Sequence, residues 1–311
     1  MTLPQLTART PFITDGGLET TLVFNDGIDL PDFAAFPLLD SEQGRAALAS
    51  YYNPYIDLAE RLGTGIVLDT PTWRANADWG ARLGYDETSL ASLNGAAVTF
   101  MNELASQRPA LTFVVNGVVG PRGDGYVVGS TMSATEAAAY HRSQARAFAE
   151  AGAGMMTAVT MTYADEAIGV ALAAHSVDMP SVLSFTVETD GRLPSGQPLG
   201  EAISQVDDAT DGVPAYYMIN CAYPTHFLAE LDPSGAWLSR IRAVRANASR
   251  LSHAELDEAT ELDRGDIREL AGHYVTLHSV LGLCVVGGCC GTDHEHVAAM
   301  AETMSIGSSA P

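Results

Sequence analysis

Lysine is absent from this sequence of 311 residues, whose 16 arginines face 38 aspartates and glutamates, for a formal net charge of −22. Nucleic acids and the anionic faces of membranes repel such a chain, because they carry negative charge themselves. We therefore expect no nucleic-acid partner and no membrane partner. The excess of acid is typical of a well-solvated protein surface.

Long apolar runs are missing as well. No run reaches the roughly 20 apolar residues of a membrane helix, and residues 1–10 lack the basic start and apolar segment of a secretion signal. We expect a soluble, cytoplasmic protein. Hydrophobic residues make up 47% of the chain, which is enough for a sizeable core. No linker rich in proline, glycine or serine and no internal repeat divides the chain, so residues 1–311 are interpreted as a single domain. Whether that domain forms a homo-oligomer stays open.

Cysteine is scarce, with four residues, too few for a disulfide framework in a chain of this length. Cys289 and Cys290 are adjacent inside the glycine-rich run 287–292, and the glycines let the backbone turn so that both sulfurs reach one point. Cys221 ends another apolar run. Three thiolates in one place are typical zinc ligands, in a reducing compartment. Buried apolar thiols are the alternative, although adjacent cysteines between glycines pack poorly.

Three segments resemble the signature segments of the homocysteine S-methyltransferase family. They are Asp-Gly-Gly-Leu-Glu-Thr at 15–20, Asn220-Cys221, and Gly-Gly-Cys-Cys-Gly-Thr at 287–292, and they stand in the family's order. The similarity extends over residues 12–300. It implies a single zinc-dependent barrel that binds a small-molecule thiol acceptor and a methyl donor. In that reading Cys221, Cys289 and Cys290 are both the zinc ligands and the catalytic groups.

Apolar runs and amphipathic stretches alternate along the whole chain. The predicted strands are 12–15, 65–69, 111–115, 155–159, 182–187, 215–220, 241–246 and 283–287. The predicted helices are 43–62, 88–106, 134–151, 164–175, 200–210, 226–238, 266–281 and 295–304. This alternation predicts an α/β fold of the (β/α)8 TIM-barrel type, with the acid-rich segment 242–266 as a long loop.

The predicted barrel would bring the cysteine-containing segments together at one end. Active-site groups of such barrels come from the C-terminal ends of the strands, and the three cysteines stand where apolar runs stop. Three thiolates leave the fourth position on zinc for a substrate thiol, whose pKa the ion lowers. The resemblance implies homocysteine as the acceptor and methionine as the product. The donor would be an onium compound such as S-methylmethionine, betaine or dimethylsulfoniopropionate.

The substrate contacts are predicted at other strand ends. Asp15, with Gly16 and Gly17 behind it, suits the ammonium of an amino-acid substrate, and the family uses the matching residue at its substrate site. At the seventh strand the family's tyrosine-proline-asparagine reads Arg245-Ala246-Asn247 here. We expect Asn247 to contact the substrate.

The second strand end contributes Thr70 and Trp73. An aromatic face attracts an onium cation through its quadrupole without a hydrogen bond, so Trp73 is the predicted wall of the donor site. Tyr163 or Trp79 could complete that wall. A simple aromatic lid on the core is the alternative.

One departure from the family concerns the acceptor. Family members usually carry a glutamate at the fourth strand end, which holds the amino group of homocysteine, and Val159 occupies that position here. Asp165 and Glu166 follow on the next predicted helix. Either another acid compensates, with Asp15 as the best candidate, or the acceptor is a thiol without an amino group. A barrel that binds zinc without turnover is a further hypothesis.

The remaining sulfur and the nearby histidines have simpler interpretations. Cys284 lies within the last apolar run, where a small core residue is expected. His294 and His296 fall in the first turn of the last predicted helix, and we expect both at the surface rather than on the metal.

Overall fold

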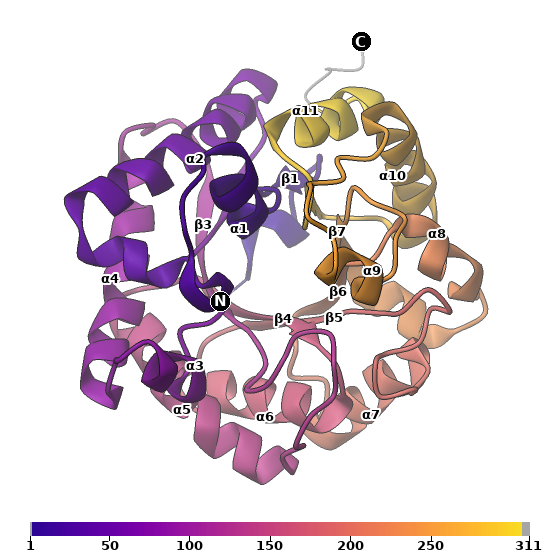
Figure 1. The fold of residues 1–311 in the computed structure, drawn as a ribbon. Coiled ribbons are helices and arrows are strands. Elements are labelled where there is room, and N and C mark those ends of the chain that lie inside the picture. The colour runs from indigo at the N-terminus through magenta and orange to yellow at the C-terminus, as the bar shows by residue number, and fades with distance from the viewer. Residues whose placement is uncertain (1, 307–311) are drawn as a thin grey trace.

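The strands of this protein close into a parallel barrel, β1 to β8 in chain order, in a computed structural model that describes residues 2–306 (Figure 1). Each strand pairs with the next, and β8 returns to β1, with Phe12 opposite Val285. The strands are β1 (Phe12–Ile13), β2 (Ile66–Asp69), β3 (Phe113–Val119), β4 (Met155–Met161), β5 (Ser181–Phe185), β6 (Tyr216–Asn220), β7 (Ile241–Ala246) and β8 (Val285–Gly288).

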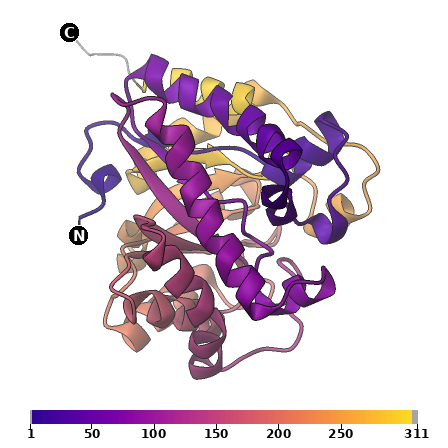
Figure 2. The same cartoon turned by 90° about the vertical axis from the view of Figure 1, so that its left-hand side faces the viewer.

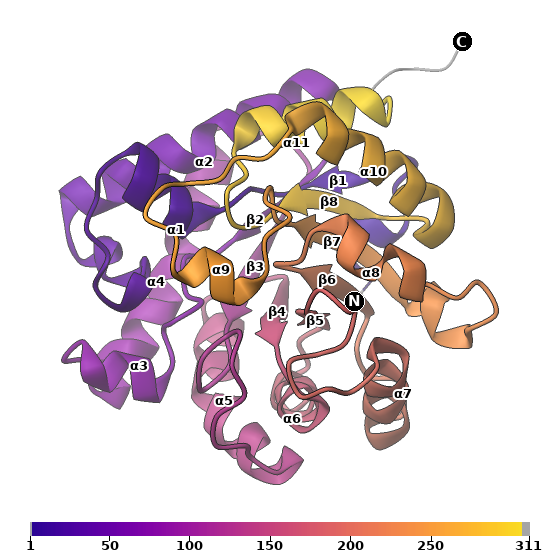
Figure 3. The ribbon, with the colours of Figure 1, turned by 45° about the vertical axis from the view of Figure 1, so that its right-hand side comes forward.

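Helices surround the ring of strands, and Figure 3 shows α1 and α9 at its open end. The α-helices are α1 (Leu18–Thr20), α2 (Glu42–Leu62), α3 (Ala77–Arg82), α4 (Glu87–Ser106), α5 (Ala134–Glu150), α6 (Ala164–His175), α7 (Leu199–Thr210), α8 (Pro224–Phe227), α9 (His253–Asp257), α10 (Ile267–Leu281) and α11 (His294–Thr303). The short 3-10 and π turns are η1 (Pro4–Leu6), η2 (Thr21–Asn25), η3 (Pro31–Phe33), η4 (Phe36–Asp40), η5 (Leu228–Glu230) and η6 (Ala236–Arg240).

Two layers of apolar side chains form the core. One fills the inside of the barrel and includes Val67, Val118 and Val182, and the other lies between the strands and the helices. Gln5, ahead of β1, donates a hydrogen bond to the Tyr216 hydroxyl over 3.3 Å. The N-terminal segment therefore closes the end of the barrel where the strands begin, on the left in Figure 2. The opposite end is where barrels of this type place their sites.

The (β/α)8 barrel that the sequence predicts is confirmed, with one clear error among the helices. The helix predicted over 226–238 is wrong, since α8, η5 and η6 divide this segment. Pro233 lacks a backbone N–H and Gly235 favours a turn, so a continuous helix cannot form across them. The strand predicted over 241–246 is confirmed as β7, but the segment 242–266 is more ordered than the predicted loop, because it also carries α9.

The expected surface position of His296 is wrong as well. Its Nδ1 lies 2.8 Å from Asp293 Oδ1 and its Nε2 lies 2.9 Å from the Arg264 carbonyl, so the ring is buried under the loop before α10. His294 is exposed, and Cys284 is buried inside the barrel, as the sequence predicts.

Among residues 2–306, no helix combines the length and the apolar character that crossing a membrane requires.

Candidate active site

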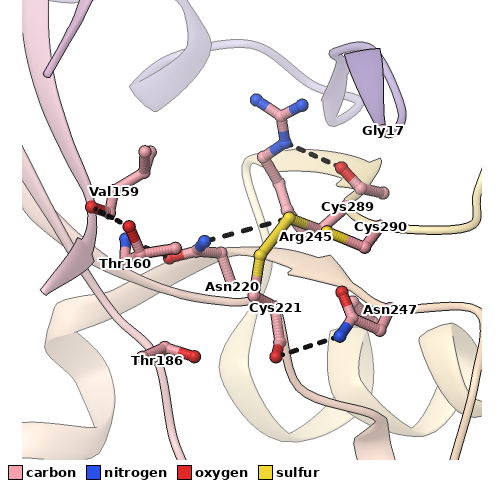
Figure 4. The surroundings of a disulfide bond; sticks show 12 residues. Gly17, Val159, Thr160, Thr186, Asn220, Cys221, Arg245, Asn247, Cys289 and Cys290 are labelled. Atoms are coloured by element: carbon pink, nitrogen blue, oxygen red, sulfur yellow. Dashed lines mark hydrogen bonds between the residues drawn. A yellow bond between two sulfur atoms is a disulfide. The ribbon is translucent and has the colours of Figure 1, made fainter. Parts of the chain in front are cut away.

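The sulfurs of Cys221, Cys289 and Cys290 meet at the barrel mouth, where all three lie within 4.8 Å of one another. Cys221 directly follows β6, and the other two directly follow β8. The sequence predicts three free thiols, but Cys221 and Cys289 form a disulfide here, and Cys290 is free (Figure 4). A disulfide and a metal ion would use the same sulfurs, so reduction is needed before these residues could bind an ion.

The reduced donor set fits a thiophilic cation. Three sulfurs this close suit a tetrahedral ion with metal–sulfur bonds of about 2.3 Å. Burial raises the pKa of the Cys290 thiol to about 11, and the nearby Tyr126 hydroxyl only partly opposes this shift. The thiol is therefore protonated at neutral pH, and a cation beside it would favour the thiolate. The three cysteines could hold a metal ion.

Gly16 and Gly17 let the turn after β1 lie directly against the cysteine turn after β8. A Cβ on Gly17 would come within 2.7 Å of the Cys289 carbonyl oxygen, and one on Gly16 within 2.7 Å of the Thr292 carbonyl oxygen. The Gly17 amide donates to that same Thr292 oxygen over 3.0 Å. Both glycines line the cavity above the sulfurs. Packing therefore requires glycine at both positions, independently of any contact that these residues make with a substrate.

The backbone of Cys221 is held in an unusual conformation. Its φ is 55°, in the left-handed region that non-glycine residues rarely occupy. Its carbonyl accepts hydrogen bonds from Asn247 Nδ2 at 3.1 Å and from His253 Nε2 at 2.6 Å. These two side chains fix the direction in which the sulfur points. Asn247, a predicted substrate contact, therefore also positions a cysteine, and His253 has a role that the sequence did not reveal.

Val159 faces the site because β4 is irregular there. The pairing of β4 with β5 shifts register between Ala158 and Met161, and Thr160 has a φ of 55°. The Thr160 amide donates to Asn220 Oδ1 over 2.9 Å, which secures this bulge. Bulges commonly redirect a side chain, and this one places Val159 in the wall of the cavity.

A buried guanidinium forms the floor of the site. Arg245, from β7, donates to Asp15 Oδ1 at 2.6 Å, to Asp69 Oδ2, and to the carbonyls of Gly16 and Gly288 at 2.9 Å each. Burial by itself lowers the pKa of Arg245, but the two carboxylates reverse this effect and raise the pKa above its usual value. Burial raises the pKa of Asp69 to about 6, against the opposing effect of Arg245.

This ion cluster changes the expected role of Asp15. The sequence predicts that Asp15 meets the ammonium of a substrate, yet its carboxylate is paired with Arg245 and also accepts a hydrogen bond from Tyr51 over 3.0 Å. The altered motif at 245–247 showed that Arg245 departs from the family's usual residue, but it gave no indication of which side chains Arg245 would contact. A cation from the protein already stands where a substrate ammonium was expected.

Glu19 is the carboxylate in this cavity that has no cationic partner. It lies in α1, and none of the other residues described within 2–306 donates a hydrogen bond to it or pairs with it within ion-pair distance. Burial, and to a smaller degree the Asp15 charge, raises the pKa of Glu19 to about 7, while a hydrogen bond from its own backbone and the more distant charges of Arg245 and Arg74 oppose this. A carboxylate in this setting favours the arrival of a cation.

Two cavities meet at the sulfurs. An inner cavity of about 80 Å³ holds Asp15, Glu19 and Val159, and an outer one of about 340 Å³ holds Asn247 and His253. The residues common to both walls are Thr20, Phe33, Trp73, Tyr126 and Cys290. All three cysteines line the inner cavity, and Cys290 lines the outer one as well, so a molecule in either cavity would lie beside a sulfur.

Tyr126 stands between the two cavities. Its hydroxyl lies 3.5 Å from Cys221 Sγ and 3.7 Å from Cys290 Sγ, and its ring packs on His253 with centroids 4.5 Å apart. Tyr126 was not predicted from the sequence. Its place between Gly125 and Gly129, after the third strand, was the available signal, but no local pattern places its hydroxyl beside the sulfurs.

Trp73 lines both cavities, and its Nε1 donates to Thr160 Oγ1 over 2.9 Å. The expected aromatic partners lie elsewhere in the described chain. Trp79 is behind Arg74, and the Tyr163 hydroxyl accepts from the Met132 amide over 3.0 Å.

Thr70 lines the inner cavity, where its Oγ1 lies 2.7 Å from Thr72 Oγ1 and accepts from the Val118 amide over 2.9 Å. Thr70 therefore shapes the loop that carries Trp73.

Comparison with known proteins finds relatives by sequence pattern and by structure. A family model described as "Homocysteine S-methyltransferase" matches residues 12–304. The oxidized form of the homocysteine methyltransferase MmuM from Escherichia coli is similar in structure, with a TM-score of 0.76 and 21% identity over 96% of this chain and 97% of that one. Its metallated form has a TM-score of 0.73 and 21% identity over 96% of this chain and 98% of that one. At such identities the two structures show a shared fold. No curated protein matches the sequence.

The sulfur cluster predicts metal binding that depends on each cysteine. The reduced protein should bind about one zinc per chain, and Cys289→Ser or Cys290→Ser should lose most of it, because a hydroxyl is a poor substitute for a thiolate ligand. Elemental analysis after dialysis measures the metal content. Cys284→Ala removes a sulfur from the barrel interior and is the matched control, which should keep the metal. Full occupancy in both serine variants would contradict the assignment.

Proposed function

We propose a specific reaction for this chain, which belongs to the homocysteine S-methyltransferase family. It is a zinc-dependent methyltransferase that moves a methyl group from an onium donor to the thiol of homocysteine and forms methionine. One observation carries the proposal: three cysteine sulfurs cluster at the barrel mouth, beside two cavities. The barrel of residues 1–311 acts as one domain in this account, in the cytoplasm, where thiols stay reduced.

Cys221, Cys289 and Cys290 would hold the zinc ion once they are reduced. When bound, zinc supplies the positive charge that makes the acceptor thiol a thiolate at neutral pH. Asn247 and His253 keep the Cys221 backbone in place for this ligand set. Tyr126, with its hydroxyl near two of the sulfurs, restricts the access of water to them.

The transfer itself conserves atoms and charge. The acceptor thiol first loses its proton to solvent. A bond then forms between its sulfur and the methyl carbon while the bond from that carbon to the donor heteroatom breaks, and the electron pair stays on the donor. The donor heteroatom becomes an uncharged sulfide sulfur or amine nitrogen, and the rest of the donor is unchanged. The aromatic faces of Trp73 and Tyr126 suit the onium charge before transfer, and holding both molecules in line lowers the barrier.

The inner cavity is the proposed place of homocysteine. The ammonium of that amino acid needs an anionic partner, and Val159 cannot supply one. Asp15 is paired with Arg245, whereas Glu19 lines the same cavity and has no cationic partner among residues 2–306. We assign Glu19 to the acceptor's ammonium, in place of the carboxylate that the fourth strand lacks.

An acceptor without an amino group is the second candidate. The observation that favours it is Val159, whose apolar side chain lines the inner cavity near the sulfurs. Such a wall suits the chain of an alkyl thiol, because burying an ammonium against it would leave a charge without a partner.

Activity on defined donors tests the proposed reaction. Reduced, zinc-loaded protein should form methionine from homocysteine with S-methylmethionine, betaine or dimethylsulfoniopropionate. Methyl-folate should be a poor donor, because its methyl-bearing nitrogen is not an onium cation and gains nothing from an aromatic face. Mass spectrometry of the product measures methionine, and Cys290→Ser is the inactive control. No methylated thiol from any of these donors would refute the proposal.

Glu19→Gln tests the acceptor. A hydrogen bond to a charged group contributes about 1.5–3 kcal/mol, so the variant should lose at least about tenfold in kcat/KM for homocysteine. It should retain its activity on propanethiol, which has no ammonium. Asp26→Asn, an exposed carboxylate of the same segment, is the matched control and should change neither value. Wild-type preference for propanethiol, with no effect of Glu19→Gln, would instead identify the second candidate as the acceptor.

A further inference from the structure

Arg74 lies in the wall of the outer cavity with much of its hydrogen-bonding capacity unused. The residue is 7% exposed, and its Nε has no hydrogen-bond partner. Its Nη1 donates to the Gly123 carbonyl over a long 3.4 Å, and its Nη2 lies 3.9 Å from Asp124 Oδ2. Because the Asp124 side chain is 45% exposed, this ion pair is weak.

The guanidinium is nevertheless held rigidly. It stacks between Trp73 and Trp79, with its central carbon 4.1 Å and 3.6 Å from the two ring centroids. Stacking fixes the plane of the group but satisfies none of its five N–H donors. Burial lowers the pKa of Arg74, and Asp124 only partly restores it. The long contacts of Nη1 and Nη2 leave these two groups weakly paired, and a ligand in the cavity would complete their hydrogen bonding.

The chemistry of that ligand follows from the shape of the group. A guanidinium presents its donors as a planar fork, which matches the two oxygens of a carboxylate. Arg74, Trp73 and Cys290 line the same cavity. The other charged residues of its wall are acidic, namely Asp124, Asp257, Glu261 and Asp263. A ligand that carries one carboxylate for Arg74 and one cationic end fits both features of this cavity.

We propose that Arg74 binds the carboxylate of the methyl donor and so selects onium compounds that carry a carboxylate over those that do not. This inference rests on the proposed methyl transfer and adds to it the residue that recognises the donor. Trp73 connects the two places where the ends of the donor would bind, since it packs on Arg74 and also lines the cavity that contains all three sulfurs. Onium cations without a carboxylate leave Arg74 unpaired and are poor donors.

Paired donors test this assignment. Dimethylsulfoniopropionate and trimethylsulfonium share a methylated sulfonium centre, but only the first has a carboxylate. Arg74→Gln should lower kcat/KM for dimethylsulfoniopropionate at least tenfold and change the value for trimethylsulfonium less than twofold. Arg74→Lys keeps the positive charge but lacks the planar pair of donors, so it should lose part of the preference for dimethylsulfoniopropionate over trimethylsulfonium. Arg82→Gln is the matched control, because Arg82 also stacks on Trp79, at 4.5 Å, but lies on the exposed surface.

A binding measurement separates this inference from the proposed reaction. Calorimetry with reduced, zinc-loaded protein and no acceptor thiol gives the Kd of each donor without turnover. Arg74→Gln should weaken dimethylsulfoniopropionate at least tenfold and leave trimethylsulfonium unchanged. Equal losses for both donors, or no loss for either, would overturn the role of Arg74 even if methyl transfer is confirmed. If Arg74→Gln weakens only the binding of dimethylsulfoniopropionate, but the wild-type protein transfers no methyl group, the role of Arg74 is supported and only the proposed reaction is refuted.

Discussion

The pairing of Arg245 with Asp15 and Asp69 is the interaction on which the rest of the site depends. It joins the ends of β1, β2 and β7, and the bond from Arg245 to the Gly288 carbonyl adds β8. Breaking a buried ion pair from one side costs about 3–5 kcal/mol, because the remaining charge loses its partner. The cluster therefore fixes the floor beneath the sulfurs. It also pairs Asp15 with a cation of the protein, whereas Glu19 lines the same cavity without an ion pair to any residue in 2–306.

Charge is divided between the two cavities in a way that suits two substrates. The inner cavity holds the Glu19 carboxylate and the apolar Val159, and the outer one holds the Arg74 guanidinium among acidic residues. The shared wall of Trp73 and Tyr126 brings both cavities to the sulfurs. A thiol in one cavity and its methyl donor in the other would both lie beside Cys290, and the transfer requires that their reacting atoms meet in line.

The fold was predictable because its signals are local, whereas the partners in the site were not. Alternating strand and helix patterns identified the barrel, and adjacent cysteines between glycines identified the sulfur cluster. Periodicity extended a helix through Pro233, and it placed the buried His296 at the surface. The Arg245–Asp15 pair joins residues 230 positions apart, and no local pattern encodes such a contact. Tyr126 was missed for the same reason, since only the closed barrel brings its hydroxyl to the sulfurs.

The central claim is that the acceptor thiol joins three cysteine sulfurs on one zinc ion. X-ray absorption at the zinc edge counts sulfur ligands directly in solution. Reduced, zinc-loaded protein should show three sulfurs, and addition of homocysteine should raise the number to four, the usual coordination of zinc by thiolates. An unchanged count of three, with homocysteine binding established by calorimetry, would contradict the account.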